Sequence, residues 1–181
     1  MLFLTNKLKK IIIKRINRNE AENRWCDIIS LINIIPHLNS SKDELFHERN
    51  PKYSKWEHSL GAYNENNDLV GIILAYYRKK DELHDIDSLY IHRLAVKSDY
   101  QNEGIGKCLI NSIIEKGFNS IKELQYVSIQ TNLEDRNKYV IDFYHEIGFE
   151  NKYTIEYPDK VDILMVISRE RFFKHNDVEL Q

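Results

Sequence analysis

The most constraining feature of the sequence is a nonpolar run, SLYIHRLAV at residues 88–96, which is followed four residues later by QNEGIGK at 101–107. The run has little polar alternation, which is typical of a central strand covered on both faces. From residue 105 onward, five residues stand at positions i, i+3, i+4, i+7 and i+8, which is the spacing of one helix face: Ile105, Cys108, Leu109, Ser112 and Ile113. The sequence therefore predicts a buried strand that passes through a glycine-containing turn into the N-terminus of a helix.

This arrangement is typical of an anion-binding site. The first N–H groups of a helix have no partner within it, the helix dipole adds about half a positive charge, and glycine lets a phosphate approach the backbone. A Walker loop needs glycine at 101 and Ser or Thr at 108, where Gln101 and Cys108 stand, and a dinucleotide fingerprint needs glycine in place of Leu109. Neither alternative fits, and a pyrophosphate is the ligand that we expect.

Two motifs resemble those of the GNAT superfamily of N-acetyltransferases. Residues 94–106 match its acetyl-CoA loop, Q/R-x-x-G-x-G/A after a strand written L-A-V, at every fixed position. Residues 137–149, NKYVIDFYHEIGF, resemble its N-x-x-A-x-x-h-Y-x-x-x-G-F helix, with Val140 in place of the usual alanine. The resemblance is strong over residues 88–149, and the order of elements extends it more weakly over about 10–168.

The resemblance implies acetyl-CoA as cosubstrate and assigns residues to it. The backbone of Leu94 and Val96 would bind the pantetheine arm like an added strand, and the Leu94 N–H would polarise the thioester carbonyl. Asn137 would contact the cosubstrate, and the Lys107 side chain would add a positive charge beside the pyrophosphate. The residues whose backbone would hold the pyrophosphate are Gln101, Asn102, Gly104, Ile105, Gly106 and Lys107.

The resemblance also implies direct transfer to an amine, without an acyl-enzyme. Tyr144 would protonate the departing CoA thiolate, since its reference pKa near 10 suits a thiol leaving group. The position where some family members carry a glutamate base is Tyr90 in this sequence. We leave the base open between a water relay and three side chains: His92, Asp87 and Glu57. The Glu103 side chain, next to the predicted phosphates, is expected to point to solvent.

We predict an α/β fold with a mixed, mostly antiparallel sheet flanked by helices on both faces. The sheet is expected to splay between its strands at 94–96 and 124–130, which admits acetyl-CoA. The predicted strands are 10–16, 56–63, 69–78, 88–96, 124–130, 152–156 and 161–168. The predicted helices are one from a capping box at Asn19 and Glu22 to before Pro36, one at 41–49, one from 105, and one at 137–147 with Gly148 as its C-cap. Residues 1–170 are interpreted as one N-acetyltransferase domain and 171–181 as a polar tail.

Charge and cysteine content exclude several classes of partner. Lys and Arg number 26 against 28 Asp and Glu, so the formal net charge is −2, and no basic field favours nucleic acid or a membrane surface. The two cysteines lie far apart without metal-ligand spacing, so neither a disulfide nor a metal site is indicated. The nonpolar runs at the N-terminus are short and broken by lysine, which predicts a cytoplasmic protein with no signal peptide and no membrane span.

The acceptor is predicted to be a primary amine of a small molecule or a peptide. The segments expected to shape its pocket are the helices at about 20–50 and the loop at 157–162. If the connection at 79–87 borders that pocket, its four acids would favour a cationic acceptor: Asp81, Glu82, Asp85 and Asp87. The alternative is a GNAT-like module that binds acyl-CoA as a sensor without catalysis; the absent glutamate favours it and Tyr144 argues against it. A homodimer is left open.

Overall fold

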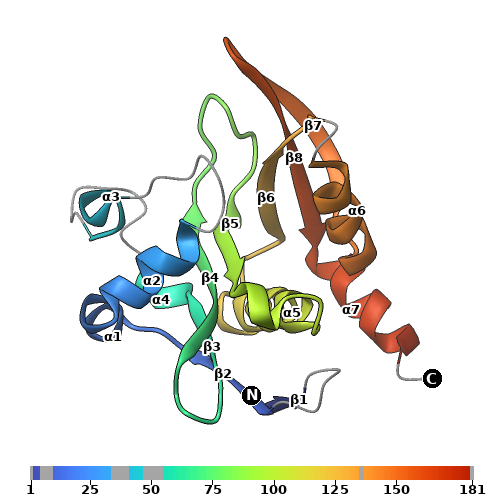
Figure 1. The fold of residues 1–181 in the computed structure, drawn as a ribbon. Helices are drawn as coiled ribbons and strands as arrows, with labels where there is room; N and C mark the ends of the chain where they lie inside the picture. The colour runs from blue at the N-terminus through green and yellow to red at the C-terminus, as the bar shows by residue number, and fades with distance from the viewer. Residues whose placement is uncertain (1, 5–9, 34–40, 47–54, 135–136, 180–181) are drawn as a thin grey trace. The chain divides into compact units, whose positions relative to one another are not determined.

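The structure, a computed structural model, describes residues 2–4, 10–33, 41–46, 55–134 and 137–179 (Figure 1). Within these residues the hydrogen-bonded strand order is β1-β2-β3-β4-β5-β6-β8-β7. The strands are β1 (Leu2–Leu4), β2 (Lys10–Arg15), β3 (Leu60–Tyr63), β4 (Leu69–Arg78), β5 (Ser88–Val96), β6 (Tyr126–Asn132), β7 (Glu150–Tyr157) and β8 (Lys160–Ser168). The helices are α1 (Arg18–Asn23), α2 (Trp25–Ile32), α3 (Lys42–Phe46), α4 (Lys55–His58), α5 (Ile105–Ser120), α6 (Lys138–Ile147) and α7 (Arg169–Glu179).

The sheet is mixed and mostly antiparallel, as predicted. Strands β5 and β6 are parallel, whereas the pairs β1–β2, β2–β3, β3–β4, β6–β8 and β7–β8 are antiparallel. The chain forms two compact units, the first from Met1–Tyr76 and His92–Lys116 and the second from Tyr77–Ile91 and Gly117–Gln181. Strands β4 and β5 and helix α5 each contribute residues to both units.

In the first unit, helices and strands share one hydrophobic cluster. Phe46 of α3 stacks on Trp56 of α4 with ring centroids 4.9 Å apart, and the Trp56 indole N–H donates to the Leu45 carbonyl at 3.0 Å. These helices are too short to be stable alone, so burial against the strands maintains them. The cluster consists of Ile16, Ala21, Ile28, Leu31, Ile32, Leu45, Phe46, Trp56, Tyr63, Leu69, Ile72, Leu74 and Ala95.

Helix α5 packs against Gly71 of β4. A Cβ atom at Gly71 would lie 3.2 Å from Cδ1 of Leu109 and 3.3 Å from Cγ2 of Ile105, which is closer than ordinary contact. The absence of a side chain therefore lets the first turns of α5 lie directly against the strand. This contact fixes the part of the helix that follows the glycine-containing loop.

Several N-terminal elements differ from the sequence predictions. The N-cap is Asn17, whose side chain accepts the Glu20 N–H at 2.9 Å, and not Asn19. The predicted single helix is interrupted at Arg24, which separates α1 from α2. Residues 55–58 form the helical turn α4 instead of the start of a strand, because Trp56 is buried in the cluster. The predicted cap at Ser41 is confirmed by its bond from the Glu44 N–H at 3.0 Å, while the predicted helix end near 49 lies outside the described residues.

The second unit contains the parallel pair, with Leu89–Ile91 opposite Val127–Ile129. One face of this pair lies against α5, since a Cβ atom at Gly117 would come within 2.6 Å of Cδ2 of Leu89. Side chains alternate between faces along a strand, and directly paired residues share a face. The register therefore places these polar residues together on the other face: Ser88, Tyr90, Ser128, Gln130, Asn132, Lys160 and Asp162.

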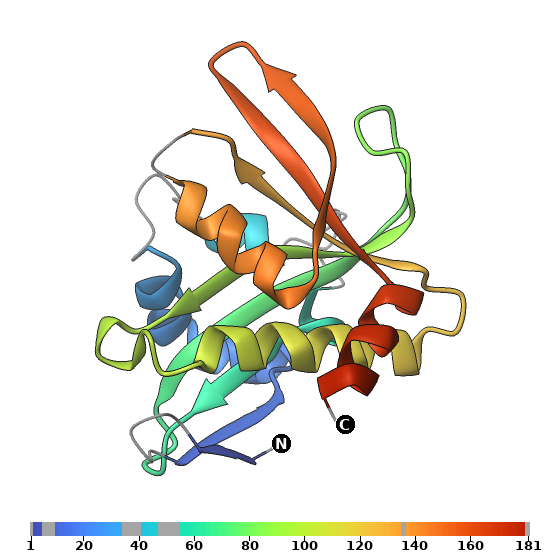
Figure 2. The ribbon, with the colours of Figure 1, turned by 90° about the vertical axis from the view of Figure 1, so that its right-hand side faces the viewer.

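The predicted polar tail begins as helix α7, which packs beside the end of α5 (Figure 2). Phe172 is buried, and its ring lies 5.9 Å from that of Phe118. The Arg169 guanidinium donates to the carbonyls of Ile121 and Leu124 at 2.8 and 2.9 Å. Two phenylalanines in a polar segment were the signal for this packing.

Gly148 ends α6 in the left-handed conformation, with φ of 108°, as the sequence predicted. Replacement of Gly148 by alanine places a Cβ in this conformation, which costs about 1–2 kcal/mol. We expect Gly148→Ala to lower the free energy of unfolding by that amount in urea denaturation. The exposed control Glu146→Ala should change it by less than about 0.5 kcal/mol, and equal effects of both variants would contradict the assignment.

Candidate functional site

The loop between β5 and α5 contains two residues in the left-handed conformation. The φ angle is 59° at Asn102 and 83° at Gly104, and asparagine and glycine are the residues that adopt this conformation most easily. The first helical hydrogen bond is donated by Cys108 to the Gly104 carbonyl at 3.0 Å. The N–H groups that precede this bond, and that can donate to an anion, belong to Ile105, Gly106 and Lys107.

Gln101 closes the turn that leads into this loop. Its side-chain amide donates to the Val96 carbonyl at 3.0 Å, and its backbone N–H donates to the Ser98 carbonyl at 3.2 Å. This side-chain contact was not predicted from the sequence, although a glutamine five residues after Val96 was its visible signal. Because the Gln101 N–H is engaged within the turn, its contact with the pyrophosphate stays a prediction.

The expectation for Glu103 is wrong. Its side chain is 1% exposed and is not directed into solvent. The left-handed residues on both sides, Asn102 and Gly104, turn the chain sharply at this point and aim the intervening side chain inward. The positive side chain of the loop, Lys107, is exposed.

Leu94 and Val96 lie in the last part of β5 and are half-buried, with buried Ala95 between them. In the described chain, the pairing of β5 with β6 ends at Ile91, whereas β5 runs on to Val96. A strand that continues beyond its partner offers backbone donors and acceptors to an extended ligand. This geometry suits the predicted role of both residues.

The other two predicted site residues, Asn137 and Tyr144, belong to the second unit. Asn137 precedes α6, and its side-chain amide donates to Oδ1 of Asn132 at 3.4 Å. Tyr144 is 5% exposed and packs on Phe149 with ring centroids 5.7 Å apart. Burial, and then the neighbouring Tyr90, raises the pKa of Tyr144 above its usual value, so its hydroxyl stays protonated and is a weaker acid than the reference value implies.

Strand β5 carries one candidate for the base, His92, and also the residue that stands in place of the family glutamate, Tyr90. Tyr90, at the position of the family glutamate, has its ring centroid 6.4 Å from that of His84, and the Arg78 guanidinium carbon lies 5.4 Å from the ring centre. His92 is 9% exposed, and its Nε2 lies 3.7 Å from Oε1 of Glu44. His92 is thus a buried side chain with a carboxylate neighbour in the first unit.

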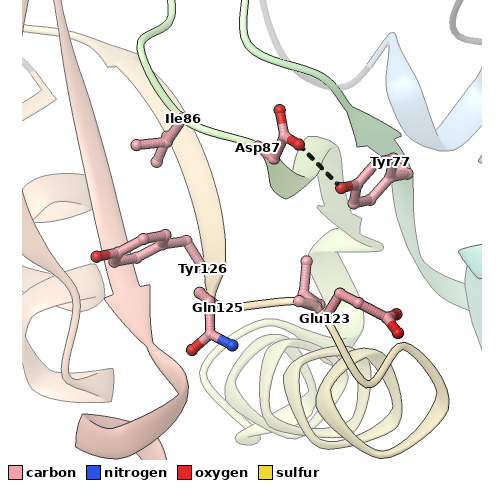
Figure 3. A pocket seen from close by; sticks show the side chains of 7 residues that line it. Tyr77, Ile86, Asp87, Glu123, Gln125 and Tyr126 are labelled. Atoms are coloured by element: carbon pink, nitrogen blue, oxygen red, sulfur yellow. Dashed lines mark hydrogen bonds between the residues drawn. The ribbon is translucent and has the colours of Figure 1, made fainter.

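The other two candidates lie elsewhere. Figure 3 shows Asp87 turned toward Tyr77, whose hydroxyl donates to Oδ2 at 3.3 Å, and Oδ1 accepts the Lys80 N–H at 2.7 Å. Glu57 is exposed on α4 in the first unit. Asp87 borders a cavity of about 230 Å³ in the second unit, lined also by Tyr77, Ile86, Glu123, Leu124, Gln125 and Tyr126. Its two hydrogen bonds make Asp87 a structural part of the β4–β5 connection.

A family comparison decides between the possible phosphate-binding folds. The model of the Acetyltransferase (GNAT) family matches residues 23–149. The chain belongs to the GNAT acetyltransferase family. Acetyl-CoA is therefore the cosubstrate of this acetyltransferase, and its reaction is acyl transfer. Binding of its phosphates by the loop of Asn102 and Gly104 and the first N–H groups of α5 stays a prediction.

Solved structures share the fold of this acetyltransferase. A structure of the NatC complex bound to Gag peptide and CoA matches with a TM-score of 0.70 and 19% identity, over 87% of this chain and 98% of that chain. NAA60 of Arabidopsis thaliana in complex with acetyl-CoA matches with 0.67 and 19%, over 87% and 99%. The ribosomal-protein-S18-alanine N-acetyltransferase from Escherichia coli matches with 0.64 and 12%, over 87% and 93%.

No curated protein sequence is significantly similar to this acetyltransferase. Among the described residues, no helix is long and nonpolar enough to cross a membrane. In the same part of the chain, no three His, Cys, Asp or Glu side chains are grouped as metal ligands would be.

Two acids of the β4–β5 connection, Asp81 and Asp85, have cationic partners. Asp81 accepts from Nη2 of Arg78 at 2.8 Å, and Oδ2 of Asp85 lies 3.5 Å from Nζ of Lys152. Asp87 is bonded as described above, and Glu82 is exposed. These contacts reduce the negative field that the connection presents to an acceptor.

The hydrogen bonds from Arg78, followed by those from His84 and the Leu83 N–H, lower the pKa of Asp81 to about 2 from 3.8. A lowered carboxyl pKa stabilises the fold above the unfolded-state value and loses this effect as pH falls from about 4 to about 2. The Asp81 side chain is 48% exposed, so the contribution is below about 1 kcal/mol. We expect Asp81→Asn to lower the free energy of unfolding at pH 7 by up to that amount, and by less at pH 3.5.

Urea denaturation at pH 7, 5 and 3.5 measures this difference. Glu82→Gln, at the exposed neighbouring position, is the matched control and should show no change of more than about 0.5 kcal/mol. A loss in Asp81→Asn that is the same at every pH would mean that shape, and not charge, is responsible.

Proposed function

We propose that this acetyltransferase transfers the acetyl group of acetyl-CoA directly to a primary amine of a peptide or a small molecule. The observation that carries the proposal is the loop with left-handed Asn102 and Gly104, which joins the end of β5 to the first N–H groups of α5. Such a loop binds phosphates through backbone groups. It suits a cosubstrate that is held by its pyrophosphate while its thioester end reacts elsewhere.

In this proposal the backbone of β5 holds the reacting end of the cosubstrate. The groups of Leu94 and Val96 pair with the pantetheine amides, and the Leu94 N–H donates to the thioester oxygen, which gains negative charge during attack. Lys107 and the loop N–H groups bind the pyrophosphate. Asn137 completes the contacts to the cosubstrate.

Tyr144 acts as the general acid. The neutral amine attacks the acetyl carbon, a C–N bond forms, the C–S bond breaks, and the sulfur takes the hydroxyl proton of Tyr144. The amine loses its surplus proton to a base or to water. The Tyr144 hydroxyl is protonated at neutral pH, as a general acid must be, and burial, by raising its pKa, makes it a weaker acid than an exposed tyrosine.

The solved relatives favour amines of peptides and proteins as acceptors. One was solved with a Gag peptide and CoA, and another is named for the alanine of a ribosomal protein. A protein N-terminus is therefore the first acceptor class to test, and small amines are the second.

Release of CoA from acetyl-CoA in the presence of peptides with free N-termini, lysine peptides with blocked N-termini, and small amines tests the proposal. We expect at least one class to be acetylated, and Tyr144→Phe to lower kcat about 10²-fold or more with little change in acetyl-CoA affinity. Tyr139→Phe is the matched control, because Tyr139 is on the same helix and 72% exposed.

Equal turnover in wild type and Tyr144→Phe would remove Tyr144 from the mechanism. Binding of acetyl-CoA without CoA release for any amine would favour an acyl-CoA sensor instead.

The phosphate-binding role of the loop is tested separately. Gly104→Asp puts a negative, branched side chain at a left-handed position beside the expected pyrophosphate, and we expect acetyl-CoA binding to be lost in calorimetry. Ser98→Asp adds the same charge at an exposed position before the loop and should bind nearly as the wild type does. Circular dichroism establishes that both variants are folded. Undiminished affinity of folded Gly104→Asp would show that the phosphates bind elsewhere.

A further inference from the structure

One face of the sheet in the second unit carries connected polar side chains, called here the polar patch: His84, Gln130, Tyr157, Lys160 and Asp162. His84 comes from the β4–β5 connection, and the other four come from β6, β7 and β8. The opposite face lies against the end of α5 at Gly117. Tyr90, at the position where some family members carry the base, shares the face of the polar patch, and its ring centroid lies 6.4 Å from that of His84. Within the second unit, the polar patch therefore adjoins the position from which the base of other family members acts on the acceptor amine.

Gln130 is the centre of the polar patch, and its orientation is fixed. Its Nε2 donates to Oδ2 of Asp162 at 2.7 Å and to the Tyr157 hydroxyl at 3.0 Å, while its Oε1 lies 3.2 Å from Nε2 of His84. Because an ionised carboxylate only accepts hydrogen bonds, the amide nitrogen must face Asp162. Gln130 thus holds Asp162 and Tyr157 in one arrangement.

The position of the Lys160 side chain indicates which chemical group Asp162 and Tyr157 can bind. Its Nζ lies 2.8 Å from Oδ2 of Asp162 and 4.9 Å from the centre of the Tyr157 ring. A carboxylate and an aromatic face are two groups that bind an ammonium ion well. A primary ammonium, supplied by the chain itself, therefore occupies the polar patch.

Asp162 has capacity for a further donor. The residue is 3% exposed, and its Oδ1 is buried and accepts no hydrogen bond from the described residues. The Lys160 side chain is 41% exposed and follows a short turn, so it can leave the carboxylate at small cost. An ammonium or guanidinium ion in its place can donate to both carboxylate oxygens.

We propose that Asp162 and Tyr157 bind a cationic group of the acceptor, in the position that the Lys160 ammonium holds in the free protein. The inference rests on the proposed function and names its substrate class. The acceptor carries a cationic group in addition to the amine that is acetylated. The two groups differ because a neighbouring carboxylate stabilises the protonated form of an amine, whereas only the neutral form attacks.

The test compares acceptors that differ only in the second charge. One pair is 1,4-diaminobutane and 1-aminobutane, and the other is a peptide with a free N-terminus and arginine or citrulline at its second position. We expect wild-type kcat/KM to be roughly tenfold or more higher for the cationic member of any pair that is acetylated, the size typical of a charged hydrogen bond.

Two variants should change this preference in opposite directions. Asp162→Asn keeps the shape and an oxygen that accepts from Gln130, and we expect the ratio between paired acceptors to fall toward one. Lys160→Met keeps the stem of the side chain and removes the competing ammonium, and we expect KM for the cationic acceptor to fall roughly threefold or more. Lys122→Met, at an exposed position after α5, is the matched control and should leave the ratio unchanged.

The outcomes separate this inference from the proposed function. Acetylation of both members with equal kcat/KM in the wild type would overturn the inference and leave amine acetylation standing, as would a preference that persists in Asp162→Asn. No CoA release with any amine would instead contradict the proposed function. If Asp162→Asn does not fold, Lys160→Met tests the inference by itself. An unchanged KM for the cationic acceptor in this variant would contradict competition between Lys160 and the acceptor for Asp162.

Discussion

The hydrogen bond from the Gln101 side chain to the Val96 carbonyl is a small contact on which the first unit's candidate site depends. It joins Gln101, just before the left-handed loop, to Val96, the last residue of β5. The chain therefore enters the loop at a fixed point. Gly71 then allows the first turns of α5 to lie directly against β4. The loop is therefore fixed at its start by Gln101, and the first turns of α5 that follow it are fixed by their contact with β4. The N–H groups at the start of α5 are in position before a ligand binds.

The central elements could be predicted from the sequence because local and tertiary signals agree there. Strand β5 has the predicted bounds 88–96, and Gly148 ends α6 as its position indicated. The signals disagree around residue 56, where a pattern that resembles a strand forms α4 because Trp56 finds a buried place against Phe46. A short stretch of sequence around Trp56 does not show that Phe46, ten residues away, packs against it.

The candidate site was predictable in its backbone and less so in its side chains. Glycine spacing located the loop, since φ preferences are local properties. The inward direction of Glu103 depends on the exact path of the loop. The pairing of Asp85 with Lys152 depends on the fold of the second unit, because the two residues are far apart in the sequence. The general base is open for the same reason, because no local pattern replaces the family glutamate.

Strand β8 and helix α7 lie beyond the residues 23–149 that the family model matches. Yet β8 separates β6 from β7, and Arg169 and Phe172 cover the carbonyls and the aromatic ring at the end of α5. The segment that the family model matches is thus shorter than the segment that forms the sheet and packs against the end of α5. Substitutions in the last thirty or so residues are constrained by the architecture of the sheet, although these residues lie outside the family motifs.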